Sequence, residues 1–144
     1  MEIEPWLIGT MLSDIQYKAD VIIGSKRHEL SSVEYTLTRK IASWGYYFIV
    51  KALFGMPYSD TQTGIKLFKR EVLEKVLPLT SIDKFAFDVE VLLIAHRLGY
   101  KICEHPVVIV NKVKKGKGST SIIACLKTFK DTLKLWRKYV SHTS

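Results

Sequence analysis

One stretch of the chain places reactive side chains directly ahead of a short strand. Asp60, Gln62 and Thr63 bring a carboxylate, an amide and a hydroxyl together just before a glycine. Residues 65–67 then alternate apolar and basic side chains, before Phe68 breaks the alternation, which is typical of a short, half-buried strand. In α/β enzymes, loops at strand ends are held by a rigid scaffold and carry much of the chemistry. The stretch therefore predicts an active-site wall with Asp60 and Gln62 as catalytic candidates; a plain polar turn is the alternative.

A hydroxyl and a cation follow the first apolar run. After Ala19 and Asp20, residues 21–23 form a short apolar run that ends in a glycine and Ser25, with Lys26 next. A continuous apolar run of this length indicates a buried strand, parallel to its neighbours. Ligands gather at the carboxyl edge of such sheets, so Ser25 and Lys26 are candidates for a pocket that accepts an anion.

Further cations lie on a long helix and in a basic loop. Arg39 and Ser43 are four residues apart and share a helix face, and a guanidinium beside a hydroxyl suits a phosphate. Lys112 and Lys115 lie in the glycine-bearing loop 111–119, which could close over an anion. Ordinary solvated charges are the alternative for both groups.

Asp88 and Glu90 are the acids of a very apolar helix predicted over 85–95. Two residues apart on a helix, they point in different directions and do not form an acid–base couple. Either one could face a pocket or interact with the helix dipole.

The elements that must position these residues follow from hydrophobic spacing and end signals. The long helix is predicted from about residue 32 to 54, because Ser31 and Glu34 resemble a capping box. A strand over 101–110 is interrupted by Pro106, which favours the edge of a sheet. The last helix, about 121–139, is basic with a narrow apolar stripe, which fits either a core contact or a membrane surface. The remaining predicted helices are 5–17 and 70–77, and the stripe comprises Ile122, Leu126, Phe129, Leu133 and Trp136.

Composition limits the class of protein. With 144 residues and 47% hydrophobic side chains, the chain predicts one α/β domain over 1–144 rather than a disordered segment. A formal charge of +8 favours an anionic partner. Nucleic acid is disfavoured, because the aromatic residues cluster in apolar helix patterns. No apolar run approaches the ~18 residues of a membrane span, and the two cysteines fit no metal or disulfide framework. A cytoplasmic protein, peripheral at the membrane face, is expected.

The order of these motifs resembles family 2 glycosyltransferases, in particular the dolichyl- or polyprenyl-phosphate mannosyl and glucosyl synthases. The collinear strings are Val-Ile-Ile-Gly-Ser-Lys, an Arg- and Ser-bearing helix, Asp-Thr-Gln-Thr-Gly-Ile-Lys-Leu-Phe, Phe-Ala-Phe-Asp-Val-Glu and Glu-His-Pro-Val. The resemblance covers essentially the whole chain. It implies a GT-A fold, which is Rossmann-like, with a short mixed sheet and flanking helices. It also implies transfer of a mannose or glucose from a nucleotide-sugar to a polyprenyl or dolichyl phosphate, assisted by Mg²⁺ or Mn²⁺.

The resemblance implies a role for each candidate residue. Asp60 matches the acid beside the metal and the acceptor phosphate, and Gln62 belongs to the same catalytic pocket. Lys26 stands where the family usually has arginine. The acceptor phosphate would be held by Lys26, Arg39, Ser43, Lys112 and Lys115, and the pocket lined by Ser25, Thr63, Asp88 and Glu90.

Two family segments are absent from the sequence. It has neither a Pro-Xaa-Tyr-Asn-Glu-like segment nor an Asp-Xaa-Asp motif, so the resemblance implies the acceptor-side half of a catalytic domain, without the nucleotide-binding half. We expect the isolated chain to be inactive or to need a partner that supplies the other half, and open sheet edges favour self-association. The alternative is a non-enzymatic module that binds lipid phosphate or a membrane surface.

Overall fold

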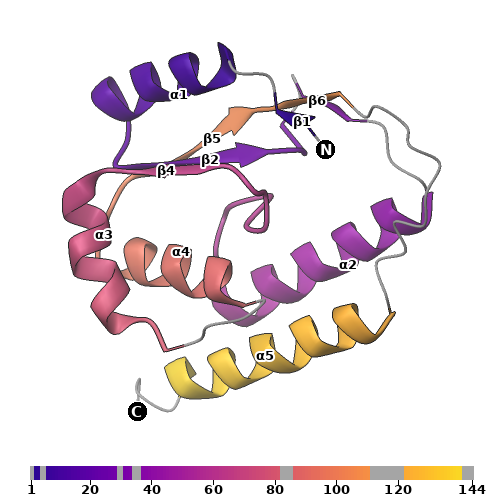
Figure 1. Ribbon diagram of the computed structural model, residues 1–144. Helices are drawn as coiled ribbons and strands as arrows, with labels where there is room; N and C mark the ends of the chain where they lie inside the picture. The colour runs from indigo at the N-terminus through magenta and orange to yellow at the C-terminus, as the bar shows by residue number, and fades with distance from the viewer. Residues whose placement is uncertain are drawn as a thin grey trace.

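The computed structural model describes residues 2–3, 6–28, 31–33, 37–81, 86–110 and 122–140. It confirms the predicted α/β class, because two three-stranded sheets are packed among helices (Figure 1). One of them is a mixed sheet of order β4-β2-β5. In it, β2 (Val21–Ser25) runs antiparallel to β4 (Lys66–Phe68) and parallel to β5 (Ile102–Pro106).

The central strand β2 is buried on both faces, as its continuous apolar run predicts. Helix α1 (Trp6–Tyr17) contributes Leu7 and Met11 to a cluster with Ile22. Val21 and Ile23 belong to a second cluster, with the apolar residues of α3 (Arg70–Val76) and α4 (Phe87–Arg97). The period-two alternation of a strand thus divides the core into two layers, which Figure 1 shows above and below the sheet.

The predicted strand 101–110 is two strands in two sheets. Val107 separates β5 from β6 (Val108–Val110), and β6 pairs with both β1 (Glu2–Ile3) and β3 (Ser32–Val33). The edge position is confirmed for β5 and wrong for β6, which lies in the middle of the order β1-β6-β3.

Helix α2 (Leu37–Phe54) begins later than the capping-box pattern predicts. The prediction was wrong because Ser31 has other partners. Its hydroxyl donates to the Ser25 carbonyl oxygen at 2.6 Å and accepts from the Val107 amide at 2.9 Å. Ser31 therefore joins the ends of β2 and β5, and the next two residues form β3 instead of a first helical turn.

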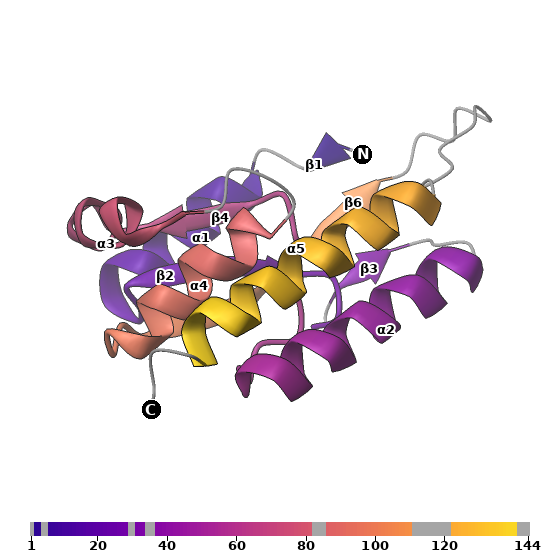
Figure 2. The ribbon, with the colours of Figure 1, turned by 90° about the horizontal axis from the view of Figure 1, so that it is seen from below.

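Helix α5 (Ile122–Val140) packs beside α2 along one side of the molecule (Figures 1 and 2). Among its described side chains, Thr132 and Leu135 are the most buried, and the Thr132 hydroxyl meets the Tyr46 hydroxyl at 2.9 Å. The predicted stripe is thus displaced around the helix, because Phe129 is 38% exposed. Among the described residues, no helix has the length and apolarity needed to cross a bilayer. Between α3 and α4, Pro78 lies in the short 3₁₀ turn η1 (Leu77–Leu79).

Candidate functional site

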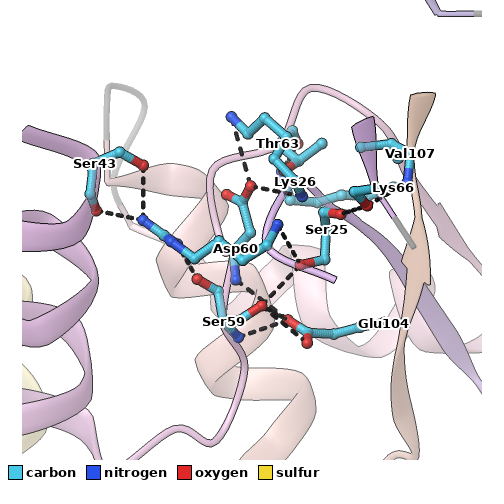
Figure 3. Close-up of polar contacts among 11 residues, drawn as sticks. Ser25, Lys26, Ser43, Ser59, Asp60, Thr63, Lys66, Glu104 and Val107 are labelled. Carbon is cyan, nitrogen blue, oxygen red and sulfur yellow. Dashed lines mark hydrogen bonds and ion pairs between the residues drawn. The ribbon is translucent and has the colours of Figure 1, made fainter. Parts of the chain in front are cut away.

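The predicted wall meets the end of β2, where a close approach of three segments brings their polar side chains together. The Ser25 and Ser59 hydroxyls are 2.8 Å apart (Figure 3). Gly24 permits this approach, because a Cβ there would lie 2.5 Å from Ile65 Cγ2 and 2.7 Å from Val107 Cγ1. The structure thus brings the end of β2 next to the predicted wall.

Asp60 is nearly buried, at 4% exposure, and its charge is matched by Lys26. The Lys26 backbone amide donates to Asp60 Oδ2 at 3.2 Å, and Lys26 Nζ lies 3.6 Å from the same oxygen. The other oxygen, Oδ1, receives no hydrogen bond from the described residues. Asp60 therefore keeps one carboxylate oxygen available for a ligand.

Glu104 fixes the backbone of this wall, and the sequence analysis missed it. From β5, its Oε1 accepts from the Ser59 amide at 2.6 Å, the Ser59 hydroxyl at 2.8 Å and the Asp60 amide at 3.2 Å. A carboxylate that accepts several backbone N–H groups holds a turn in one conformation. An acid within an otherwise apolar strand was the available signal.

Arg27 is the second residue that the sequence analysis missed. Its guanidinium donates to the Ser59 carbonyl, the Ser43 carbonyl and, at 2.7 Å, to Ser43 Oγ. The carbon Cζ lies 5.2 Å and 5.0 Å from the ring centroids of Trp44 and Tyr47, within cation–π range. Arg27 thus links helix α2 to the wall, and its position after the strand, next to Lys26, was the signal.

Thr63 and Asp88 lie on another side of the same wall and are connected through Lys66. Lys66 Nζ donates to the Thr63 carbonyl at 2.5 Å and to Asp88 Oδ1 at 3.0 Å. Thr63 is only 2% exposed, and its hydroxyl has no hydrogen-bond partner in the part of the chain that the structure describes. Gln62 is exposed at the rim.

Glu90 is not brought to this site, although it was predicted in the pocket. Its side chain is fully buried on the other side of α4 and accepts from the Ser81 amide at 3.0 Å and from Lys138 Nζ at 3.2 Å. Arg39 lies in α2, but its side chain is not among those described. Lys112 and Lys115 lie outside the described residues.

A divalent cation would find one suitable oxygen here. The described residues contain no group of three or more His, Cys, Asp or Glu side chains that could hold a metal. Mg²⁺ is commonly bound through one or two carboxylates plus the phosphates of its substrate. Asp60 Oδ1 fits one position in such a shell, and the rest would have to come from a diphosphate and water.

The site thus belongs to an α/β domain whose cations, hydroxyls and carboxylates converge at a strand end. Comparison with known proteins identifies relatives of this chain. It is 33% identical over 101 residues to a dolichyl-phosphate β-glucosyltransferase of Dictyostelium discoideum, covering 65% of this chain and 31% of the relative. It is also 33% identical over 105 residues to the enzyme of that name from Saccharomyces cerevisiae, covering 69% and 31%. The human protein of that name is 33% identical over 86 residues, covering 58% and 26%.

No family model matches the chain, and no solved structure matches it significantly. The chain spans about a third of the length of the curated relatives that it matches. Over about two thirds of its own length it is homologous to part of these glycosyltransferases, all of which carry glucosyl- rather than mannosyltransferase names.

Proposed function

We propose that this chain forms the acceptor-side part of a glycosyltransferase that transfers glucose from a nucleotide-sugar to dolichyl phosphate or a related polyprenyl phosphate. The observation that carries the proposal is the convergence of Lys26 and Asp60 at the end of β2, to which Arg27 joins Ser43 of α2. The names of the relatives support dolichyl phosphate as acceptor and glucose as the sugar.

The residue types suit a phosphate that acts as nucleophile. A phosphate monoester needs no base to attack the sugar, so the site must position it and neutralise its charge. Lys26 and Arg39, with Lys112 and Lys115 of the basic loop, would hold the phosphate. Asp60 would orient it, and Ser25 and Thr63 would line the pocket. Mg²⁺ or Mn²⁺, held by Asp60 Oδ1 and the diphosphate, would draw negative charge from the leaving group.

Donor binding needs residues that this sequence does not contain. The sequence has no Asp-Xaa-Asp motif, and the matched segments cover 31% of the first two relatives. We propose that the chain by itself binds the acceptor without turnover, and that catalysis needs a complementing nucleotide-binding half. In the described structure β5 is an edge strand, and such an edge can pair with a second copy or with the complementing half.

One observation favours a second candidate, a module that binds membrane surfaces without catalysis. Helix α2 exposes large apolar side chains at helical spacing: Ile41, Trp44 and Phe48. Beside it, α5 exposes Lys127, Lys130 and Lys134. Aromatic and basic side chains on neighbouring helices fit the interface of an anionic bilayer. The same surface would hold the proposed enzyme at the cytoplasmic face of the membrane, where its lipid acceptor is anchored.

Two measurements separate these candidates. In flotation, the chain is expected to bind phosphatidylcholine vesicles with dolichyl phosphate more strongly than vesicles with phosphatidylserine at equal charge. Arg39→Ala is expected to weaken that preference. Equal binding to both vesicles, lost only with added salt, would instead support the membrane-surface module.

Turnover tests the enzymatic proposal directly. With UDP-glucose, Mn²⁺ and dolichyl phosphate, the chain alone is expected to give no product. Addition of the part of the yeast relative that the chain does not match is expected to restore product, and GDP-mannose serves as the control donor. Robust product from the chain alone would contradict the need for a second half, and no product in any combination would contradict the enzymatic proposal.

A further inference from the structure

We propose that Arg27, rather than Lys26, is the main phosphate-binding side chain at the end of β2. The resemblance to known glycosyltransferases points to Lys26, which stands in place of their arginine. The geometry points one residue further along the chain. This inference rests on the proposed function, because it concerns the acceptor phosphate of that same site.

Lys26 and Arg27 differ in how far nearby carboxylates compensate their charges. The Lys26 ammonium faces the Asp60 carboxylate at 3.6 Å, with the lysine and aspartate side chains 17% and 6% exposed. Much of its charge is therefore already compensated. Arg27, in contrast, contacts two carbonyl oxygens, one hydroxyl and two aromatic rings, all of them neutral. None of the described carboxylates pairs with it. A half-buried guanidinium without a counterion attracts an anion.

Arg27 has more N–H donors than its present contacts use. A guanidinium has five N–H groups in a planar fork. Those of Arg27 meet three acceptor atoms, namely the Ser59 carbonyl, the Ser43 carbonyl and Ser43 Oγ. Two N–H donors are therefore left for a ligand. Ser43 Oγ accepts from Arg27, so the Ser43 O–H also stays available to donate, because a hydroxyl both accepts and donates.

The Arg27 guanidinium is also preorganised for binding. The existing hydrogen bonds and the faces of Trp44 and Tyr47 hold the guanidinium in one orientation before any ligand arrives. Less conformational entropy is then lost when an anion binds. Ser43 and Ser59 hold Arg27 between α2 and the wall. An anion on its remaining donors would lie beside Asp60, where the proposed reaction needs the acceptor phosphate.

The test first compares four forms of the whole chain: wild type, Arg27→Gln, Lys26→Gln and Arg97→Gln. Arg97 serves as the matched control, because it is an exposed arginine that packs over Tyr139 at 4.9 Å, away from the site. Farnesyl phosphate, a soluble prenyl monophosphate, is titrated into each by calorimetry, with inorganic phosphate as the second ligand. Arg27→Lys is added because it keeps the charge and loses the fork. Thermal unfolding checks that each variant is folded.

Arg27→Gln is expected to weaken farnesyl phosphate binding at least tenfold and Lys26→Gln less than threefold, with Arg97→Gln unchanged. Arg27→Lys is expected to recover only part of the loss. A folded Arg27→Gln that binds like wild type, while Lys26→Gln loses binding, would overturn this inference and leave the proposed function standing. A wild-type chain that binds inorganic phosphate but shows no preference for farnesyl phosphate would contradict the proposed function itself, and this inference with it.

Discussion

Two buried carboxylates, Asp60 and Glu90, differ in how completely their oxygens are bound. Glu90 of α4 is fully buried, and both of its oxygens accept hydrogen bonds. Asp60 is almost as buried, yet both of its donors reach the same oxygen, Oδ2.

This difference distinguishes a structural carboxylate from one that can serve a ligand. Around Glu90, donors from Ser81, Lys138 and Tyr139 join three segments of the chain. Such a network stabilises the fold only while every member is bound. Around Asp60, the backbone is held by Glu104 instead, so the aspartate itself is not needed for the shape of the wall. Burial alone therefore does not identify the functional acid; an available oxygen does.

The largest expected effect on stability comes from Glu90, the structural carboxylate. Glu90→Gln is expected to lower the free energy of unfolding by about 3 kcal/mol. Ser81 N–H donates to Oε2, and the Ser81 and Lys138 donors reach Oε1, so either orientation of the amide sets its NH₂ against a donor. Urea unfolding measures the change. A loss below about 1 kcal/mol would show that the network around Glu90 is dispensable.

The next effect concerns the close approach that builds the functional side. Gly24→Ala is expected to destabilise the chain by about 2 kcal/mol, because the new methyl group overlaps Ile65 and Val107. Gly9→Ala is the control, since nothing lies within 4 Å of its would-be Cβ. Urea unfolding of both variants is the measurement, and equal stabilities would contradict the tight packing at the end of β2.

Asp60→Asn completes the comparison with Glu90→Gln, because both replace a carboxylate by its amide. Here the amide oxygen can keep the hydrogen bond from the Lys26 amide, and the NH₂ takes the place of Oδ1, which no described donor faces. Because the Lys26 ammonium, 3.6 Å from Oδ2, loses its counterion, we expect a loss of about 1 kcal/mol in unfolding free energy, well below that of Glu90→Gln. A loss as large as that of Glu90→Gln would assign Asp60 a structural role.

The smallest expected effect is a pH dependence of stability caused by Tyr139, which contacts Glu90. Burial, followed by the charge of Glu90, raises the pKa of Tyr139 from 10.0 to about 12. A raised pKa for an acid means that folding favours its neutral form, so this stabilisation is complete below pH 10 and is lost as the pH rises towards 12. Tyr139→Phe is expected to flatten the fall in stability over that window, measured by urea unfolding at several pH values. An unchanged slope in the variant would contradict the assignment.

The sequence predicts the elements better than it predicts the contacts between them. The apolar run of β2 and the alternation of β4 depend on local periodicity, and both strands lie where that periodicity places them. Asp60, Lys26 and Asp88 could be found because polar residues at strand and helix ends stand out from apolar runs. Glu104 and Arg27 could not be placed, since their roles depend on which strands pair and which helix approaches. Ser31 shows the same limit, because a capping pattern was overridden by bonds to two distant strands.

The most direct test determines whether a ligand binds near Asp60 or near Glu90. Farnesyl phosphate is titrated into the ¹⁵N-labelled chain, and amide chemical shifts are followed by NMR. The account predicts saturable shifts at Lys26, Arg27, Ser59 and Asp60, with little change at Ser81, Glu90 and Tyr139. Shifts confined to the Glu90 side, or no saturable shift at the end of β2, would contradict the claim that the Asp60 wall is the acceptor-phosphate site.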